Sequence, residues 1–342
     1  MSQLTTTRIV LPGIVEPEEL LVRESALAAP GPGQAVVRVE ASGVSFAEQQ
    51  MRRGKYYDQP PFPFTPGYDL VGRVEAAGPG VDEALIGTRV AAVTKTGAWA
   101  TAVAVDAGDL VPVPDGVDPA AAETVVVNGV TAWQMLHRTA QVRPGGTILV
   151  LGANGGVGST LTQLARHAGI RVVGTASPRH HDAVRALGAE PLDYRSPDLA
   201  AQARALSPGG YDAVFDHVGG AGIADSWRLV ARGGTLVSYG TAATKNDAGN
   251  ARLPVLGLFA RLLWWNILPN GRGAHFYNLW AGRRDRARFQ ARLRSDLTSV
   301  FALLADGSLT AQVAARIPLE RAAEALRLAE SGTVAGKVVL VA

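Results

Sequence analysis

The sequence of 342 residues contains no cysteine and only six histidines, all of which lie after residue 136. Without cysteine, the protein has no disulfide bonds, no thiolate zinc sites and no thiol nucleophile. A catalytic zinc ion needs about three protein ligands, commonly drawn from Cys, His and Asp or Glu. We therefore predict no metal site and interpret each histidine as a surface or cofactor-adjacent residue. The histidines are His137, His167, His180, His181, His217 and His275.

The chain also has little net charge, +3 at pH 7, although its pI is near 9.3. Its densest basic stretch, residues 283–294, contains six arginines interleaved with Phe289 and Leu293 in a helical pattern. A helical apolar pattern without stacking aromatic residues is typical of a solvated helix face. We therefore predict no nucleic-acid partner.

A charged stretch followed by an apolar run is missing from the N-terminal sequence MSQLTTTRIVLPG, so we predict no signal peptide and a cytoplasmic location. The most apolar stretch, residues 254–268, contains an arginine and is too short to span ~30 Å of hydrocarbon. Three roles are open for the wider segment 251–273: a wall over an apolar substrate pocket, a dimer contact, or peripheral membrane contact.

Two patterns divide the chain. Residues 1–127 contain short β-branched runs separated by Gly and Pro turns, which predicts a compact β domain. From about residue 129, strand and helix patterns alternate, which indicates parallel βαβ units in a doubly wound sheet. We therefore predict an α/β protein with two domains.

The segment ILVLGANGGVGS contains a glycine turn between a predicted strand and a predicted helix. Residues 153–158 match G-x-G-x-x-G, with Ala153 in the first glycine position. Gly155 allows the backbone to approach a pyrophosphate, and Gly158 allows close packing of helix and strand. We therefore predict a dinucleotide site that includes the turn residues Asn154, Gly155, Gly156 and Val157.

No Asp or Glu follows the second strand of this unit, where an acidic residue usually binds the ribose hydroxyls of NAD. The positions hold Ser177 and Arg179 instead, and a hydroxyl and a guanidinium suit a 2′-phosphate. The sequence therefore predicts NADPH as the cofactor.

Five further segments form a recognisable combination: residues 41–78, NGVTAWQML (128–136), GANGGVG (152–158), LGAEPLDY (187–194) and GKVVL (336–340). Together they resemble the zinc-free medium-chain dehydrogenase/reductases, and the quinone oxidoreductases of the zeta-crystallin type above all. The apolar segment 251–273 is similar to one in the VAT-1-like branch. The resemblance implies a GroES-like catalytic domain from residues 1–127 and 283–342, a Rossmann domain from 128–282 with NADPH between them, and a homodimer that pairs through residues 274–280.

The resemblance also assigns site residues. The family pattern NFxDxxxRxGxY appears here as SFAEQQMRRGKY, which makes Ser45, Glu48 and Tyr56 line the nicotinamide end, with Ser for Asn and Glu for Asp. These two departures change the reach of the hydrogen bonds that this stretch can make. The remaining residues implied at the cofactor are Asn128 and Thr131 near the nicotinamide amide, Ser177 and Tyr194 at the 2′-phosphate, His217, Val218, Gly240 and Thr241 at two strand ends, and Lys337 near the last strand.

The expected activity is reduction of an apolar quinone or α,β-unsaturated carbonyl compound, because a site without zinc needs an acceptor that is already electrophilic. Tyr56 is the first candidate for the proton donor and Ser45 the second; Tyr56 packing against nearby prolines, with solvent as the proton source, is the competing interpretation. The alternative function is an NADPH-binding adaptor or regulatory protein with little turnover. Such a protein could also lie at a membrane surface.

Overall fold

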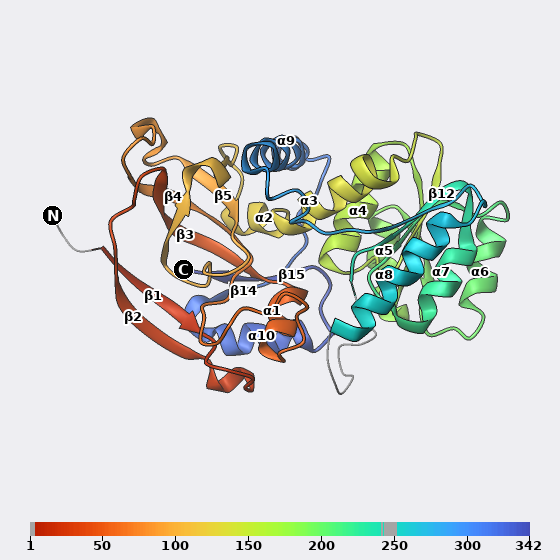
Figure 1. Cartoon of the computed structure of the whole chain (residues 1–342), viewed down its shortest axis with the longest axis horizontal. Coiled ribbons are helices and arrows are strands. Elements are labelled where there is room, and N and C mark those ends of the chain that lie inside the picture. Colours follow the sequence, from red (N-terminus) through yellow and green to blue (C-terminus); the bar gives the residue numbers. More distant parts are fainter. Residues whose placement is uncertain (1–3, 241, 243–251) are drawn as a thin grey trace. The chain divides into compact units, whose positions relative to one another are not determined.

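The computed structural model describes residues 4–240, 242 and 252–342. The chain divides into two compact units. Unit 1 comprises Met1–Val130 and Gly282–Ala342, and unit 2 comprises Thr131–Ala281. In Figure 1 the colours of unit 1 come from both ends of the scale, because its last segment returns to it after unit 2. The predicted domain boundaries at 127 and 282 stay a prediction, since compactness alone does not show independent folding.

Unit 1 is built on a seven-stranded sheet with the order β14-β15-β3-β4-β5-β7, in which β6 also pairs with β3. β14 and β15 run parallel, and the other pairs are antiparallel. The register places Val338 opposite Val44, so the last strand of the chain lies beside β3. The strands are β1 Leu4–Val10, β2 Leu21–Leu27, β3 Gln34–Val44, β4 Asp69–Ala77, β5 Arg89–Val93, β6 Ala102–Asp106, β7 Val111–Pro112, β14 Val313–Pro318 and β15 Lys337–Val341.

Short helices of unit 1 begin at residues that cap them. Ser45 caps α1 (Phe46–Arg52), and Glu48 returns a contact to the Ser45 backbone, a reciprocal arrangement that fixes the first turn. Asp118 caps α2 (Pro119–Thr124), where proline occupies the first helical position. The other α-helices that begin in this unit are α3 Val127–Trp133, α9 Arg286–Ala305 and α10 Ala322–Glu330.

Unit 2 contains a six-stranded parallel sheet with the order β10-β9-β8-β11-β12-β13. The strand order reverses between β8 and β11, and ligands of doubly wound sheets bind at the carboxyl ends of strands at such a point. The predicted α/β class with a doubly wound sheet is confirmed. The strands are β8 Thr147–Val150, β9 Arg171–Ala176, β10 Ala189–Asp193, β11 Tyr211–Asp216, β12 Val230–Ser238 and β13 Gly273–Phe276; the helices are α4 Gly156–His167, α5 His181–Ala186, α6 Leu199–Leu206, α7 Ile223–Leu229 and α8 Arg252–Ile267.

The apolar segment 251–273 is largely a helix, α8, which the sequence pattern did not indicate. A surface helix is recognised by an apolar stripe that recurs about every 3.6 residues, and α8 has apolar residues on all sides. Of the helices that the structure describes, none has the length and apolar character needed to cross a membrane. The expected cytoplasmic location stays a prediction.

Candidate functional site

The glycine turn of unit 2 connects β8 to α4. Gly152 adopts φ = +69°, a conformation that glycine accepts without strain. A Cβ atom at Gly158 would lie 2.2 Å from the Gly152 carbonyl oxygen, so only glycine allows α4 to pack this closely. Gly155 is the N-cap and has no side chain to occupy the N–H groups of the first turn. The turn therefore presents backbone donors and the positive end of the helix dipole to an anion.

Ser177 follows the end of β9 and is buried. Its hydroxyl accepts a hydrogen bond from Nη2 of Arg195 over 2.8 Å, and the Arg195 guanidinium lies 5.3 Å from the centre of the Tyr194 ring. The exposed Arg179 donates from Nε to the His180 ring over 3.2 Å. The sequence prediction missed Arg195, although it directly follows Tyr194. Ser177, which was predicted to bind the 2′-phosphate, is therefore in contact with the guanidinium of Arg195 and not with that of Arg179.

The carboxyl ends of β11 and β12 bring His217 and Gly240 together. Nδ1 of His217 lies 3.0 Å from the Leu151 carbonyl oxygen, and burial lowers the pKa of this imidazole. A Cβ atom at Gly240 would lie 2.6 Å from the His217 carbonyl oxygen. Asp216, which sequence reasoning missed, accepts 2.8 Å hydrogen bonds from the backbone N–H groups of Val218 and Gly219. Thr241 lies outside the described residues.

In unit 1 the predicted residues Ser45 and Glu48 are in direct contact. The Ser45 hydroxyl donates a short hydrogen bond to Oε2 of Glu48, which also accepts from the Ser45 backbone N–H over 2.9 Å. Oε1 of Glu48 accepts from the Tyr68 backbone N–H over 2.7 Å. Burial raises the pKa of Glu48, and this effect outweighs the stabilising contact with Ser45. Glu48 therefore joins the start of α1 to the chain just before β4.

Tyr56 and Tyr68 form a pair of hydroxyl groups 3.0 Å apart. Their rings meet edge to face at 84°, with centres 6.5 Å apart, and Tyr57 lies 4.8 Å from Tyr56. Burial and the neighbouring Tyr68 raise the pKa of Tyr56 well above its ordinary value. Tyr56 therefore stays protonated at pH values where an ordinary tyrosine begins to ionise, so its hydroxyl remains a hydrogen-bond donor. Tyr68 was not predicted, because no local pattern links it to Tyr56.

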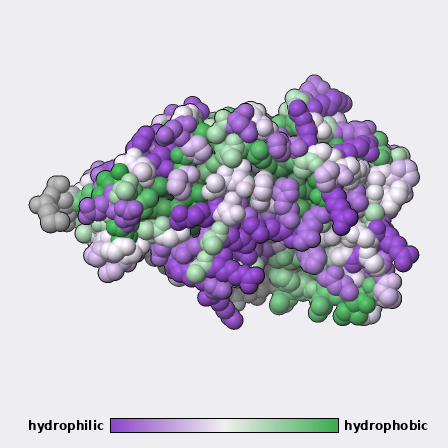
Figure 2. All heavy atoms as spheres, turned by 90° about the horizontal axis from the view of Figure 1, so that it is seen from above, coloured by the Kyte–Doolittle hydropathy of each residue, from purple (hydrophilic) through white to green (hydrophobic). Residues whose placement is uncertain are grey.

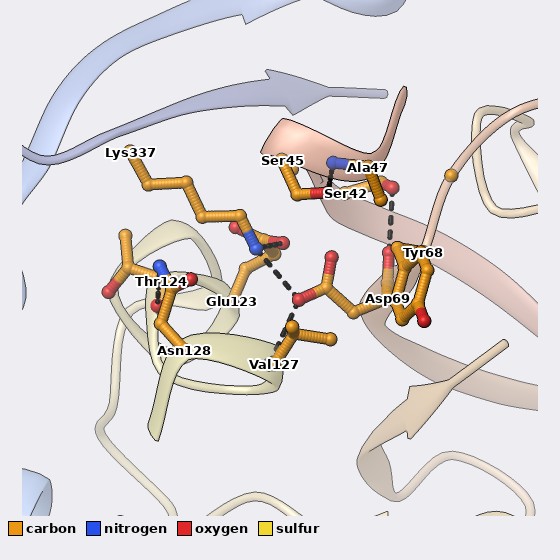
Figure 3. Close-up of polar contacts among 12 residues, drawn as sticks. Ser42, Ser45, Ala47, Tyr68, Asp69, Glu123, Thr124, Val127, Asn128 and Lys337 are labelled. Carbon is orange, nitrogen blue, oxygen red and sulfur yellow. Dashed lines mark hydrogen bonds and ion pairs between the residues drawn. The ribbon is translucent and has the colours of Figure 1, made fainter. Parts of the chain in front are cut away.

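Lys337 lies inside unit 1, where its ammonium group donates to Oδ2 of Asp69 and to Oε1 of Glu123, both over 2.7 Å (Figure 3). All three side chains are almost completely inaccessible to solvent. Asp69 Oδ2 also accepts from the Val127 backbone N–H over 3.1 Å. A Cβ atom at Gly43 would lie 2.0 Å from Cε of Lys337, so glycine leaves the space that the lysine fills. Asp69 and Glu123 were missed because they come from distant parts of the chain.

Two carboxylates and one ammonium would leave an uncompensated negative charge inside the unit, which is costly. Burial and the like charge of Asp69 raise the pKa of Glu123 well above its ordinary value, in spite of Lys337. Burial alone would lower the pKa of Lys337, but Asp69 and Glu123 together raise it. The cluster is therefore neutral when Glu123 holds a proton, beside one ammonium and one carboxylate.

Replacing Glu123 by glutamine is expected to preserve this neutral arrangement. A carboxyl whose pKa is raised by folding stabilises the folded state below its unfolded value near 4.5, and this contribution is lost as the pH rises toward the folded pKa. Urea unfolding at several pH values should show a smaller loss of stability for E123Q than for the parent between about pH 5 and 8. E190Q, an exposed substitution, is the control; equal slopes for E123Q and the parent would contradict the assignment.

Asn128 and Thr131 are both buried on α3. The Asn128 amide donates to the Thr124 carbonyl oxygen over 3.0 Å, one residue from Glu123. Figure 3 shows Ser45, Asn128 and Lys337 in one region of unit 1 with Tyr68 and Asp69. Glu48 and Tyr56 join this region through their hydrogen bonds with Tyr68. The ammonium of Lys337 meets carboxylates of its own unit, and its predicted contact with the cofactor stays a prediction.

Metal ligands do not gather in the described part of the chain: no group of three or more His, Cys, Asp or Glu residues there is arranged to hold an ion. The Lys337 ammonium occupies the position between Asp69 and Glu123 that a cation would otherwise take.

Two family models match this sequence. Residues 31–115 match the alcohol dehydrogenase GroES-like domain, and residues 187–340 match a family described as zinc-binding dehydrogenase. The synaptic vesicle membrane protein VAT-1 homolog of Rattus norvegicus is 32% identical over 335 residues, which cover 94% of this chain and 80% of that protein. These matches confirm the GroES-like and dinucleotide-binding architecture.

Solved structures are similar over nearly the whole chain. The quinone oxidoreductase of Pseudomonas syringae superposes with a TM-score of 0.84 at 29% identity, covering 98% of this chain and 100% of that one. A mycobacterial protein solved in complex with NADPH has a TM-score of 0.83 at 28% identity, with the same coverage.

Proposed function

We propose that this chain, which belongs to the medium-chain dehydrogenase/reductase family, is an NADPH-dependent reductase of quinones or α,β-unsaturated carbonyl compounds that works without zinc. The observation that carries the proposal is the glycine turn at the start of α4, together with a guanidinium and not a carboxylate at Ser177. The similar mycobacterial protein solved with NADPH supports the choice of cofactor.

The residues of unit 2 fit a phosphorylated dinucleotide. The backbone N–H groups after Gly155 would bind the pyrophosphate, because the N-terminus of α4 carries partial positive charge. Ser177 and Arg195 would bind the 2′-phosphate, and the Tyr194 ring beside Arg195 would hold the guanidinium in place. Bound NADPH supplies a hydride and no proton.

Unit 1 would supply the proton. When a conjugated carbonyl accepts a hydride at carbon, negative charge develops on its oxygen, and a hydroxyl donor stabilises that charge. Tyr56 is our candidate donor, and Tyr68 positions it through the 3.0 Å contact between the two hydroxyl groups. Tyr68 is itself held by Glu48 at its backbone N–H. Ser45, whose hydroxyl donates to Glu48, is better placed to position this network than to transfer a proton.

Zinc independence is supported by the donor set. The chain has no cysteine, and unit 1 has no histidine at all. A conjugated acceptor needs no Lewis acid, since its carbon is already electrophilic. The homodimer remains part of the proposal, because β13 is the outermost strand of its sheet and an edge strand can pair with a second copy.

The test is the oxidation of NADPH by the purified full chain with a panel of enones and quinones. We expect oxidation that depends on the acceptor and persists after treatment with a zinc chelator. Saturable NADPH binding without turnover on any acceptor would favour the NADPH-binding adaptor. Turnover that requires stoichiometric zinc would contradict the metal-free mechanism.

Replacing Arg195 by alanine is expected to raise the KM for NADPH about 10-fold to 100-fold, because a charge-assisted hydrogen bond contributes about 1.5–3 kcal/mol. The KM for NADH should change little, since NADH has no 2′-phosphate. R179A should show a smaller effect in the same direction. R185A, which removes an exposed arginine paired with Asp182, is the matched control. The assignment of the 2′-phosphate site would be refuted if the ratio of the KM for NADPH to the KM for NADH were the same in R195A, R179A and the parent.

A further inference from the structure

Large apolar side chains are exposed on one helix far more than elsewhere. Of the eleven large apolar residues that are exposed in the described part of the chain, six lie on α8 or directly after it. Monomeric soluble proteins rarely expose apolar patches of this kind unless the patch binds something. The six residues, called here the α8 face, are Leu256, Phe259, Leu263, Trp264, Ile267 and Leu268.

The opposite side of α8 fixes the helix on unit 2. Leu258 and Leu262 are buried in the core of this unit, and the Trp265 ring stacks on Trp227 at 4.9 Å with an angle of 4°. The Asn266 side chain exchanges hydrogen bonds of 2.6 and 2.8 Å with the backbone of Ala274 on β13. Because these contacts hold the helix, the α8 face cannot turn inward to be buried.

The α8 face runs along the helix. Leu256, Phe259, Leu263 and Ile267 follow one another at spacings of three and four residues, so they share a side of the helix. Figure 2 shows hydrophobic residues gathered along the lower right edge of the molecule. Sixteen residues of helix extend about 24 Å, enough to lie along a lipid surface but not to cross it.

The charged residues of this segment have one sign. Residues 252–281 contain three arginines and no Asp or Glu. Arg261 lies on α8 itself and is exposed, and Arg272 follows the helix, with its guanidinium 5.7 Å from the centre of the Trp227 ring. Trp264 and Arg261 lie three residues apart and are both exposed, and tryptophan and arginine are residue types that gather where a protein meets the membrane interface.

The charge pattern distinguishes between occupants. In a symmetric dimer the same patch meets itself, which would place arginines opposite arginines with no acidic residue of this segment to balance them. An anionic lipid surface offers the complementary charge and an apolar layer. We propose that the α8 face docks unit 2 on membranes that contain anionic lipid, with α8 parallel to the surface. This inference does not depend on the proposed reaction.

Sedimentation of the full chain with vesicles tests the proposal. We expect it to bind vesicles of phosphatidylcholine with phosphatidylserine, to bind pure phosphatidylcholine at least tenfold more weakly, and to dissociate as salt is raised. The double variant L263E/W264E should lose at least tenfold in affinity, and R261E should weaken binding only when phosphatidylserine is present. I86E, which changes an exposed apolar residue of unit 1, is the matched control and should bind like the parent.

A second measurement reports the position of the helix. Brominated lipids should quench the fluorescence of the bound parent, and W264F should lose most of this quenching while it still binds. Thermal unfolding should show that L263E/W264E is folded, because both side chains are exposed. Vesicle binding by this double variant at the affinity of the parent would overturn the proposal. Failure of the parent to bind vesicles would also overturn it. So would the finding that the parent is a dimer that binds no lipid and that L263E/W264E is a monomer, because the α8 face would then be a contact between two copies of the chain.

Discussion

Replacing Lys337 by methionine is expected to lower the free energy of unfolding by about 3–5 kcal/mol, because it leaves buried carboxyl groups without their cation. Lys337 donates to Asp69 and Glu123, and all three side chains are buried. Methionine has a similar length, so the loss reports the charge and not an empty space. Urea unfolding measures it.

The control for this prediction is K95M. Lys95 pairs with Asp58 at a partly exposed position, and such pairs contribute at most about 1 kcal/mol. The double variant K337M/D69N should recover part of the stability lost in K337M, since it removes the stranded charge. If K337M costs less than about 1 kcal/mol, the cluster is not the structural centre that its burial suggests. If folded K337M binds NADPH more weakly than the parent does, that result would instead support the predicted contact between Lys337 and the cofactor.

Replacing Tyr56 by phenylalanine is expected to lower kcat by about 10²- to 10⁴-fold, the usual contribution of a positioned acid, with a small change in the KM for NADPH. Because burial and Tyr68 raise the pKa of Tyr56, kcat of the parent should not fall as the pH approaches the ordinary tyrosine value near 10. Y68F should reduce kcat less than Y56F, because it removes a hydrogen bond to the donor and not the donor. Steady-state kinetics over a range of pH measures both.

Y57F is the control for this pair. Tyr57 packs on Tyr56 with ring centres 4.8 Å apart and also hydrogen-bonds to it, so the substitution removes a second neighbouring hydroxyl and leaves the Tyr56–Tyr68 contact in place. We expect kcat of Y57F to remain within a fewfold of the parent. An undiminished kcat in Y56F would show that solvent delivers the proton and that Tyr56 only packs against its neighbours.

The parts of the site that sequence could predict are those made by neighbours in the chain. The turn between β8 and α4 needs glycine within a few residues, and Ser45 meets Glu48 at the spacing of a helix cap. Such contacts follow from local backbone geometry, so the residue pattern carries them. The doubly wound class of unit 2 also follows from the alternation of strands and helices, whereas the strand order itself comes from the structure.

Other parts depend on contacts between distant residues. Lys337 meets Asp69 across 268 positions and Glu123 across 214, and no local pattern indicates which acids a lysine will meet. Arg195 reaches Ser177 only because β10 lies beside β9, whereas Arg179, closer in sequence, contacts His180. Tyr68 becomes the partner of Tyr56 because the chain between them folds back.

The apolar segment shows the same division. The sequence alone established that its apolar stretch is too short to span a membrane and that the whole segment is longer than an ordinary connection. Only the tertiary structure decided which of its side chains are covered, since Trp227 and β13 bury one side of α8 and leave the other exposed. Sequence thus determined the family, the nucleotide turn and the lack of thiol ligands, because each depends on residue type and short spacing. The buried Lys337–Asp69–Glu123 cluster, the tyrosine pair and the exposed helix face were decided by packing, because each requires segments that meet only in the folded chain.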